Sequence, residues 1–120
     1  MAGKILAVVE NLFFLAKIQH AAQEVNITVE SALPEDLSER LVRKGAAAVF
    51  LDLNHRSGKA VEVLQAIKGN SAISSVPVVA FLPHVEGDLA RTARAAGCDV
   101  VLARSAFSQQ LPQLLKKYAG

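Results

Sequence analysis

The sequence has little cysteine, little net charge and no long hydrophobic run. Cys98 is the only cysteine in 120 residues, which excludes an internal disulfide and indicates a reducing compartment such as the cytoplasm. The formal net charge of +2 is too small to indicate a nucleic-acid partner. No apolar stretch approaches the roughly 20 residues of a membrane span. Glu10 and Asn11 interrupt the apolar run after Lys4, and no signal-peptide cleavage site follows. We therefore expect a cytoplasmic domain that binds neither membranes nor nucleic acids.

Apolar residues make up 52% of the sequence and gather in five short runs. A chain of this length and composition can bury a core, so residues 1–120 are predicted to form a single domain. Four runs are continuously apolar, which is typical of parallel strands covered on both faces. The second run alternates polar and apolar residues, which indicates a half-exposed edge strand. The runs are "KILAVV" from Lys4, "NITVES" from Asn26, "AAVFLD" from Ala47, "VPVVAFL" from Val76 and "DVVLA" from Asp99.

Helical patterns separate and follow these runs. The apolar residues Leu15, Ile18, Ala22 and Val25 share one face of a first predicted helix. Pro34 and Gly45 mark the start and end of a second. Further helices are predicted over about 59–68, over 88–97 and from Ser108, with Pro112 in the first turn of the last. Five alternations of strand and helix predict a parallel sheet with right-handed crossovers. With the second strand at an edge, the predicted α/β fold is a flavodoxin-like doubly wound five-stranded sheet of order 2-1-3-4-5 with five flanking helices.

Two carboxylates are predicted to face each other at the carboxyl ends of the strands. In this fold, ligands bind where the winding of the sheet reverses, between the first and third strands. Glu10 ends the first strand and Asp52 ends the third. This placement favours a functional role for Asp52 over that of a simple cap at the start of a loop.

From Lys4 to Tyr118 the chain resembles the receiver domains of bacterial response regulators, whose fold is called CheY-like. The resemblance is clearest in "VPVVAFLPH" and "ARAAGCDVVLARSAF", which match the fourth strand, fourth helix and fifth strand of that family. It implies a role in two-component or phosphorelay signal transduction, with Asp52 in the position of the aspartate that a histidine kinase phosphorylates. The family uses a magnesium ion held by an acidic pair after strand one, a hydroxyl residue after strand four and a lysine after strand five.

This sequence departs from the family pattern at most of these positions. The acidic pair is Glu10-Asn11, the hydroxyl position holds Leu82, and Arg104-Ser105 replaces the lysine-proline pair. The loop "LNHRSG" after Asp52 is also two residues shorter than usual. The catalytic positions implied by the resemblance are therefore Asp52, Arg104 and Leu82. A weak magnesium site is expected from Glu10, Asn11, Asp52 and Asn54, because Mg²⁺ depends on anionic oxygen ligands.

Two hypotheses about function follow from these replacements. In the first, the guanidinium of Arg104 clamps Asp52 as a permanent ion pair. The domain is then a degenerate receiver, or pseudo-receiver, that is not an enzyme and acts through protein contacts with a histidine kinase or a downstream effector. The alternative is a small metal- or phosphate-handling enzyme that uses Asp52, Glu10, His55 and His84.

Two further features bear on partners. Leu12, Phe13 and Phe14 follow the rim directly, and they either plug the degenerate pocket, form an apolar contact surface or pack with two of the three buried. Basic residues gather around the predicted fourth and fifth helices, where receivers commonly dimerise. The sequence thus also suggests a homodimer through the fourth helix, fifth strand and fifth helix. These basic residues are Arg91, Arg94, Arg104, Lys116 and Lys117.

Overall fold

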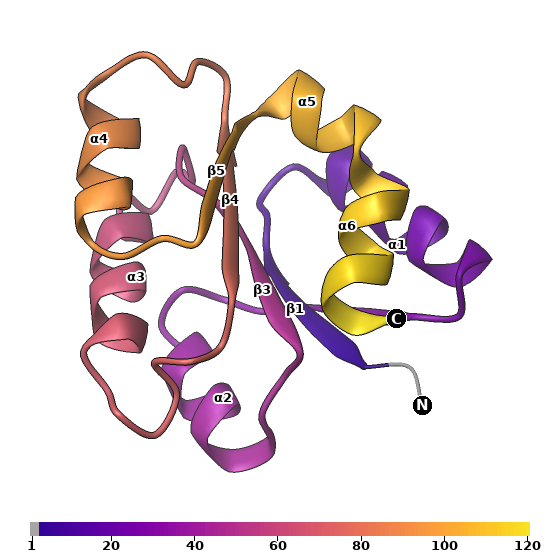
Figure 1. Cartoon of the computed structure of the whole chain (residues 1–120), viewed down its shortest axis with the longest axis horizontal. Coiled ribbons are helices and arrows are strands. Elements are labelled where there is room, and N and C mark those ends of the chain that lie inside the picture. The colour runs from indigo at the N-terminus through magenta and orange to yellow at the C-terminus, as the bar shows by residue number, and fades with distance from the viewer. Residues whose placement is uncertain (1–2) are drawn as a thin grey trace.

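The computed structural model describes residues 3–120, which form a five-stranded parallel sheet with helices on both faces (Figure 1). The strand order is β2-β1-β3-β4-β5, and every neighbouring pair is parallel. This confirms the predicted fold class and the edge position of the second strand. The strands are β1 (Lys4–Val8), β2 (Thr28–Ser31), β3 (Ala48–Asp52), β4 (Val78–Leu82) and β5 (Val100–Ala103).

Alternate residues of the central strands pack against two separate hydrophobic clusters, one on each face of the sheet. Along β3, Val49 and Leu51 belong to one cluster, whereas Ala48 and Phe50 belong to the other. All five residues of β3 and all five of β4 are buried. This double burial explains why these strands are apolar up to Asp52, whereas three of the four residues of the edge strand β2 are polar.

The helices divide between the two faces, as Figure 1 shows. One face carries α2 (Leu37–Lys44), α3 (Ala60–Lys68) and α4 (Asp88–Ala95), and the other carries α1 (Leu12–Glu24), α5 (Arg104–Gln109) and α6 (Leu111–Ala119). The predicted inward positions Leu15, Ile18 and Ala22 of α1 are buried, whereas Val25 caps the end of the helix and is only partly buried. Among the helices of residues 3–120, none combines the length and the apolar character needed to span a membrane.

Two helix boundaries differ from the sequence-based prediction. The segment from Pro34 forms a turn before α2 begins at Leu37, and the amide of Asp36 donates to the carbonyl of Leu33 at 3.0 Å. The last helical region starts at Arg104 rather than Ser108 and is interrupted at Gln110, so two helices stand where one was expected. Pro112 explains the interruption, because it lacks an N–H and its ring would clash with a carbonyl four residues earlier in a continuous helix.

Candidate functional site

Asp52 is the only buried polar or charged residue among residues 3–120, with 5% of its surface exposed. It is the last residue of β3 and lies opposite Phe81 of β4 in the sheet register. Its Oδ1 accepts a hydrogen bond of 2.9 Å from the backbone N–H of Asn54. The apolar strand therefore carries one carboxylate to the rim of the sheet, where the following loop turns back over it.

The surroundings of Asp52 favour its neutral form more than water does. Burial raises the pKa of Asp52 above its ordinary value of 3.8, and the nearby carboxylate of Glu10 adds to this rise. The N–H of Asn54, the positive charge of Arg104 and the nearby His55 act in the opposite direction, but burial is the larger effect. Asp52 is thus a carboxylate whose charge is only partly compensated by the protein.

The Glu10-Asn11 pair is already engaged by other protein groups. The carboxylate of Glu10 accepts from the backbone N–H of Arg56 and pairs with the Arg56 Nε, each at 3.2 Å. The Oδ1 of Asn11 accepts from the N–H of Phe14 at 3.0 Å and so caps the N-terminus of α1. A cation at this rim would have to compete with those donors. Of the four residues expected to hold magnesium, only Glu10 and Asp52 carry charged oxygens.

Leu82 is a core residue rather than a rim residue. It ends β4, is 4% exposed and packs in the cluster on the α2–α4 face. In the register of the sheet it lies beside Ala103, the last residue of β5. The positions that end β4 and β5 therefore bring no hydroxyl group to Asp52.

Arg104 does not form the predicted clamp on Asp52. Within the part of the chain that the structure describes, no salt bridge includes Arg104. Its guanidinium carbon lies 5.6 Å from the centre of the Phe14 ring, and its Nε is buried without a hydrogen-bond partner among residues 3–120. The expected ion pair is thus replaced by a cation–π contact, and Arg104 acts on Asp52 only as a nearby positive charge.

A cluster of four aromatic rings lies beneath Arg104, and sequence reasoning did not find it. Phe107 lies at the centre, with ring centres 5.9 Å from Phe14, 5.1 Å from Phe50 and 4.6 Å from Phe81. Phe14 and Phe81 are also in contact, at 5.1 Å. These residues come from α1, β3, β4 and α5, so no local pattern links them.

The three apolar residues after the rim separate into two groups. Phe14 packs inward against the aromatic cluster, while Leu12 and Phe13 are 75% and 89% exposed. Packing with two of the three buried is therefore wrong. The exposed pair leaves an apolar surface on the first turn of α1, next to Glu10 and Asn11.

The four residues of the enzyme hypothesis do not form a metal site in this structure. Within residues 3–120, no group of three or more His, Cys, Asp and Glu side chains is placed to hold a metal ion. His84 is exposed, and the Nδ1 of His55 lies 2.9 Å from the hydroxyl of Ser57 in its own loop. Of that set, Glu10 and His55 both influence the pKa of Asp52, in opposite directions.

The comparisons with known proteins give a likeness in structure only. No family model and no curated protein matches the sequence. The receiver domain of a sensor histidine kinase from Pseudomonas aeruginosa, with magnesium in its active site cleft, has a TM-score of 0.84 at 16% identity, covering 98% of both chains. The Vibrio cholerae chemotaxis response regulator CheY4 has a TM-score of 0.84 at 17% identity, covering 98% of this chain and 99% of its own.

A phosphorylated protein is among the similar structures. The cyanobacterial phytochrome response regulator RcpA has a TM-score of 0.78 at 23% identity, covering 98% of this chain and 91% of its own. The match extends over nearly the whole of each chain, so it concerns the complete domain rather than a shared motif. This chain therefore has the CheY-like receiver fold of response regulators, as its sequence resemblance implied.

Proposed function

We propose that this protein is a degenerate receiver: a signal-transduction domain that is not an enzyme and acts through protein contacts. The observation that carries the proposal is the isolation of Asp52. It lies at the carboxyl end of β3, where receivers carry their phosphoacceptor, yet the hydroxyl and lysine partners of the family are replaced by Leu82 and Arg104. The site keeps the acceptor position and lacks the groups that would read its phosphorylation.

The missing hydroxyl affects the conformational response to phosphorylation more than it affects the phosphorylation reaction itself. A modification shifts a conformational equilibrium only if it interacts differently with the two states. A phosphoryl group on Asp52 would find a buried leucine at the end of β4, with no donor to draw that strand end inward. Phosphorylation would therefore leave β4 and β5 largely unchanged.

A weak magnesium site at Asp52 and Glu10, with Asn11 and Asn54 beside them, belongs to the same proposal. Mg²⁺ requires near-octahedral oxygen ligands, and here Glu10 is tied to Arg56 and Asn11 caps a helix. A bound Mg²⁺ would neutralise charge on an incoming phosphoryl group. The residues present give it two carboxylates, both of which must first be released from or shared with protein donors.

The exposed pair Leu12 and Phe13 supports signalling through contacts. A partner that covers the 89% exposed phenylalanine and the 75% exposed leucine beside it would remove their apolar surface from water, which favours association. The pair lies on the first turn of α1, directly after Glu10 and Asn11, so a partner that covers it would also contact the rim. We propose a histidine kinase or a downstream effector as this partner, and a homodimer through α4, β5 and the α5–α6 region as a second assembly.

Phosphorylation by acetyl phosphate tests the proposal. We expect the natural protein to react poorly in the presence of Mg²⁺. The triple variant Arg104→Lys, Leu82→Thr and Asn11→Asp should gain phosphorylation, because it restores the acidic pair, the hydroxyl and the lysine of the family. The same triple variant with Asp52→Asn is the matched control, and it should not be labelled. Intact-mass spectrometry measures the phosphorylated fraction, and Asn11→Asp keeps an N-cap side chain on α1.

One result would reverse the conclusion. Stoichiometric, Mg²⁺-dependent labelling of the natural protein at Asp52, with amide chemical-shift changes that spread to β5, is the behaviour of an active receiver. Labelling without changes at β5 supports the proposal, since it shows an acceptor without a switch. Absence of labelling supports it equally.

A further inference from the structure

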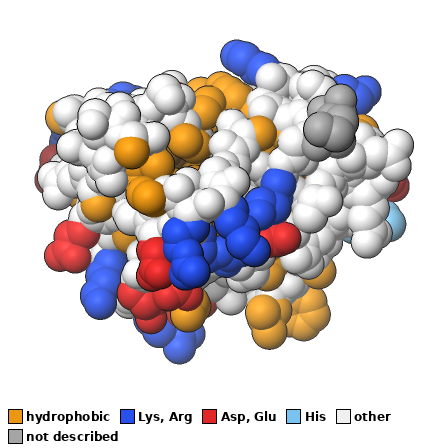
Figure 2. All heavy atoms as spheres, turned by 90° about the horizontal axis from the view of Figure 1, so that it is seen from below, with side chains coloured by type: hydrophobic (Ala, Val, Ile, Leu, Met, Phe, Trp, Pro, Cys, Tyr) orange, Lys and Arg blue, Asp and Glu red, His pale blue; other side chains and the backbone are white. Residues whose placement is uncertain are grey.

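A pocket lies at the opposite end of the sheet from Asp52, where β1 begins and α2 ends. It has a volume of about 330 Å³ and is open to solvent. Figure 2 views the molecule from below and shows Lys and Arg side chains gathered on this face, with a few acidic side chains among them. The lining residues are Lys4, Leu6, Glu30, Arg40, Arg43 and Lys44.

The lining holds four cations and a single carboxylate. The Oε1 of Glu30 forms ion pairs with two of these cations, Arg40 at 2.8 Å and Lys4 at 3.6 Å. Arg40 also donates to the carbonyl of Ser31 at 2.7 Å, so its guanidinium is held at the pocket wall. Glu30 thus fixes two cations in place and leaves a large excess of positive charge around the cavity.

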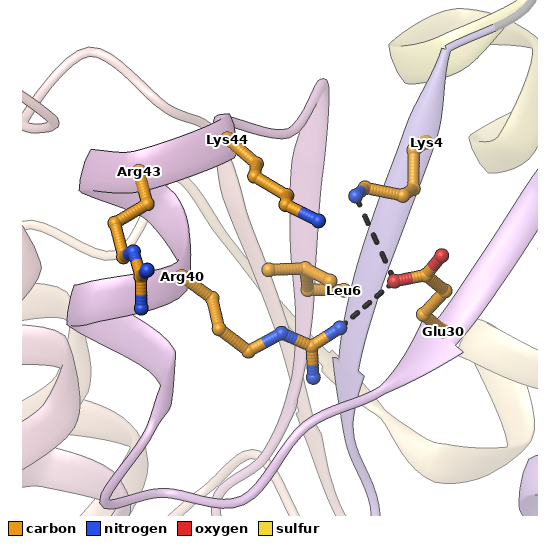
Figure 3. A pocket seen from close by; sticks show the side chains of 6 residues that line it. All are labelled: Lys4, Leu6, Glu30, Arg40, Arg43 and Lys44. Atoms are coloured by element: carbon orange, nitrogen blue, oxygen red, sulfur yellow. Dashed lines mark hydrogen bonds and ion pairs between the residues drawn. The ribbon is translucent and has the colours of Figure 1, made fainter.

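The other two cations are much less compensated. Lys44 takes part in no ion pair within residues 3–120. Arg43 pairs with Glu39 at 3.1 Å, but both side chains are about 70% exposed, and such pairs are weak. In Figure 3 the Lys44 ammonium points towards Lys4 and Arg40 across the space above Leu6, while Arg43 stands further back on α2.

Helix electrostatics explain only part of this arrangement. Basic residues in the last turn of a helix interact favourably with its dipole, which accounts for Arg43 and Lys44 on α2 alone. It does not account for Lys4, which comes from β1, or for Arg40, which lies earlier on α2. Three cations from two elements converge on one cavity, and the single carboxylate of its lining pairs with only two of them, Arg40 and Lys4.

We propose that this pocket binds a small phosphate-containing polyanion, that is, a ligand with at least two negative charges close together. A guanidinium fork and ammonium groups are the side chains that bind phosphate oxygens best. A cavity lined by one sign of charge also concentrates ions of the other sign. The volume lies at the lower end of the range for small-molecule sites, which limits the ligand to a compact one. The site is separate from Asp52 and does not depend on its phosphorylation.

Titration with inorganic pyrophosphate, followed by amide chemical shifts, tests the inference. Magnesium is omitted, and ionic strength is held constant with sodium chloride. We expect saturable shifts in the millimolar range or below at Lys4, at Glu30 and over the last turn of α2. The amides around Asp52 should stay unchanged, because that rim lies at the other end of the strands.

Three variants distinguish a specific binding site from nonspecific attraction of anions. Lys44→Gln should weaken pyrophosphate binding about three- to fivefold, as expected for the loss of one exposed charge contact. Glu30→Gln should strengthen binding, because it removes the one carboxylate and releases two cations. Arg94→Gln is the matched control: Arg94 is exposed on α4, and this change alters the net charge by the same amount. It should leave the affinity unchanged.

The opposite results would overturn the inference. Shifts that rise linearly without saturation, or shifts confined to the rim around Asp52, would show that the pocket is not a site. Equal weakening by Arg94→Gln and Lys44→Gln would show a diffuse counterion effect. Weaker binding in Glu30→Gln would also contradict it, since the excess positive charge would then not be what attracts the ligand.

Discussion

Replacing Arg104 by methionine should make the protein more stable. In the structure the Nε–H of Arg104 is buried without a partner, which costs about 1–3 kcal/mol relative to a satisfied donor. The substitution gives up the cation–π contact with Phe14, about 0.5–1 kcal/mol. A methionine sulfur over the same ring recovers roughly as much. The net expectation is a gain of about 1 kcal/mol in the free energy of unfolding.

The pH dependence of this gain distinguishes the contact with Phe14 from an ion pair with Asp52. The folded-state pKa of Asp52 is raised above 3.8, so between pH 3.8 and that raised pKa the native protein binds more protons than the unfolded chain. Stability therefore falls as pH rises through this window. Arg104 opposes the rise, so its removal should raise the pKa of Asp52 further and extend the window upward. The stability gain of Arg104→Met should therefore be largest in acid and smaller at neutral pH.

Urea unfolding at several pH values measures the effect. With an m-value of about 2 kcal/mol/M, a gain of 1 kcal/mol moves the midpoint by about 0.5 M. Phe14→Leu is the companion variant, because it removes the ring and leaves the guanidinium. If Arg104→Met instead lowers stability at neutral pH by about 1 kcal/mol or more, and this loss disappears in acid, then Arg104 clamps Asp52 in solution and the reasoning from the cation–π contact is refuted.

Three other predictions follow from single positions. Asp52→Asn should raise stability at neutral pH, because an amide does not carry the desolvation cost of a buried carboxylate, and the gain should shrink as the wild-type carboxyl becomes protonated in acid; a loss at neutral pH would contradict it. Phe107→Ala should lower the free energy of unfolding by about 3–5 kcal/mol, because it removes a fully buried ring that contacts three other rings. A loss below about 1 kcal/mol in urea unfolding would show a loosely packed cluster. Asn11→Ala should cost about 1 kcal/mol through loss of the α1 cap, whereas Asn11→Asp should not; equal losses would show that the cap is not what matters.

Most of the sheet was predictable from local patterns. Runs of apolar residues marked the buried strands, and the alternation in "NITVES" marked the edge, because the number of covered faces decides how many positions along a strand must be apolar. Once strand order was inferred, the general geometry of doubly wound sheets placed Asp52 at the rim. The helix boundaries were less accurate at Pro34 and Ser108. Proline excludes certain helical hydrogen bonds, but it does not decide on which side of it the helix begins.

The partners of individual side chains were decided only by the tertiary structure. The sequence suggested that Arg104 would pair with Asp52, since it replaces the lysine that the receiver family carries after strand five, but packing placed the guanidinium over the ring of Phe14 instead. The cation cluster of Lys4, Arg40 and Lys44 was equally invisible, because it joins a strand and a helix 36 or more residues apart. Periodic patterns report whether a position faces the core, which depends on the residue's own element. Which side chain it contacts there depends on rotamers and on the approach of other elements, and these are set only when the whole core packs.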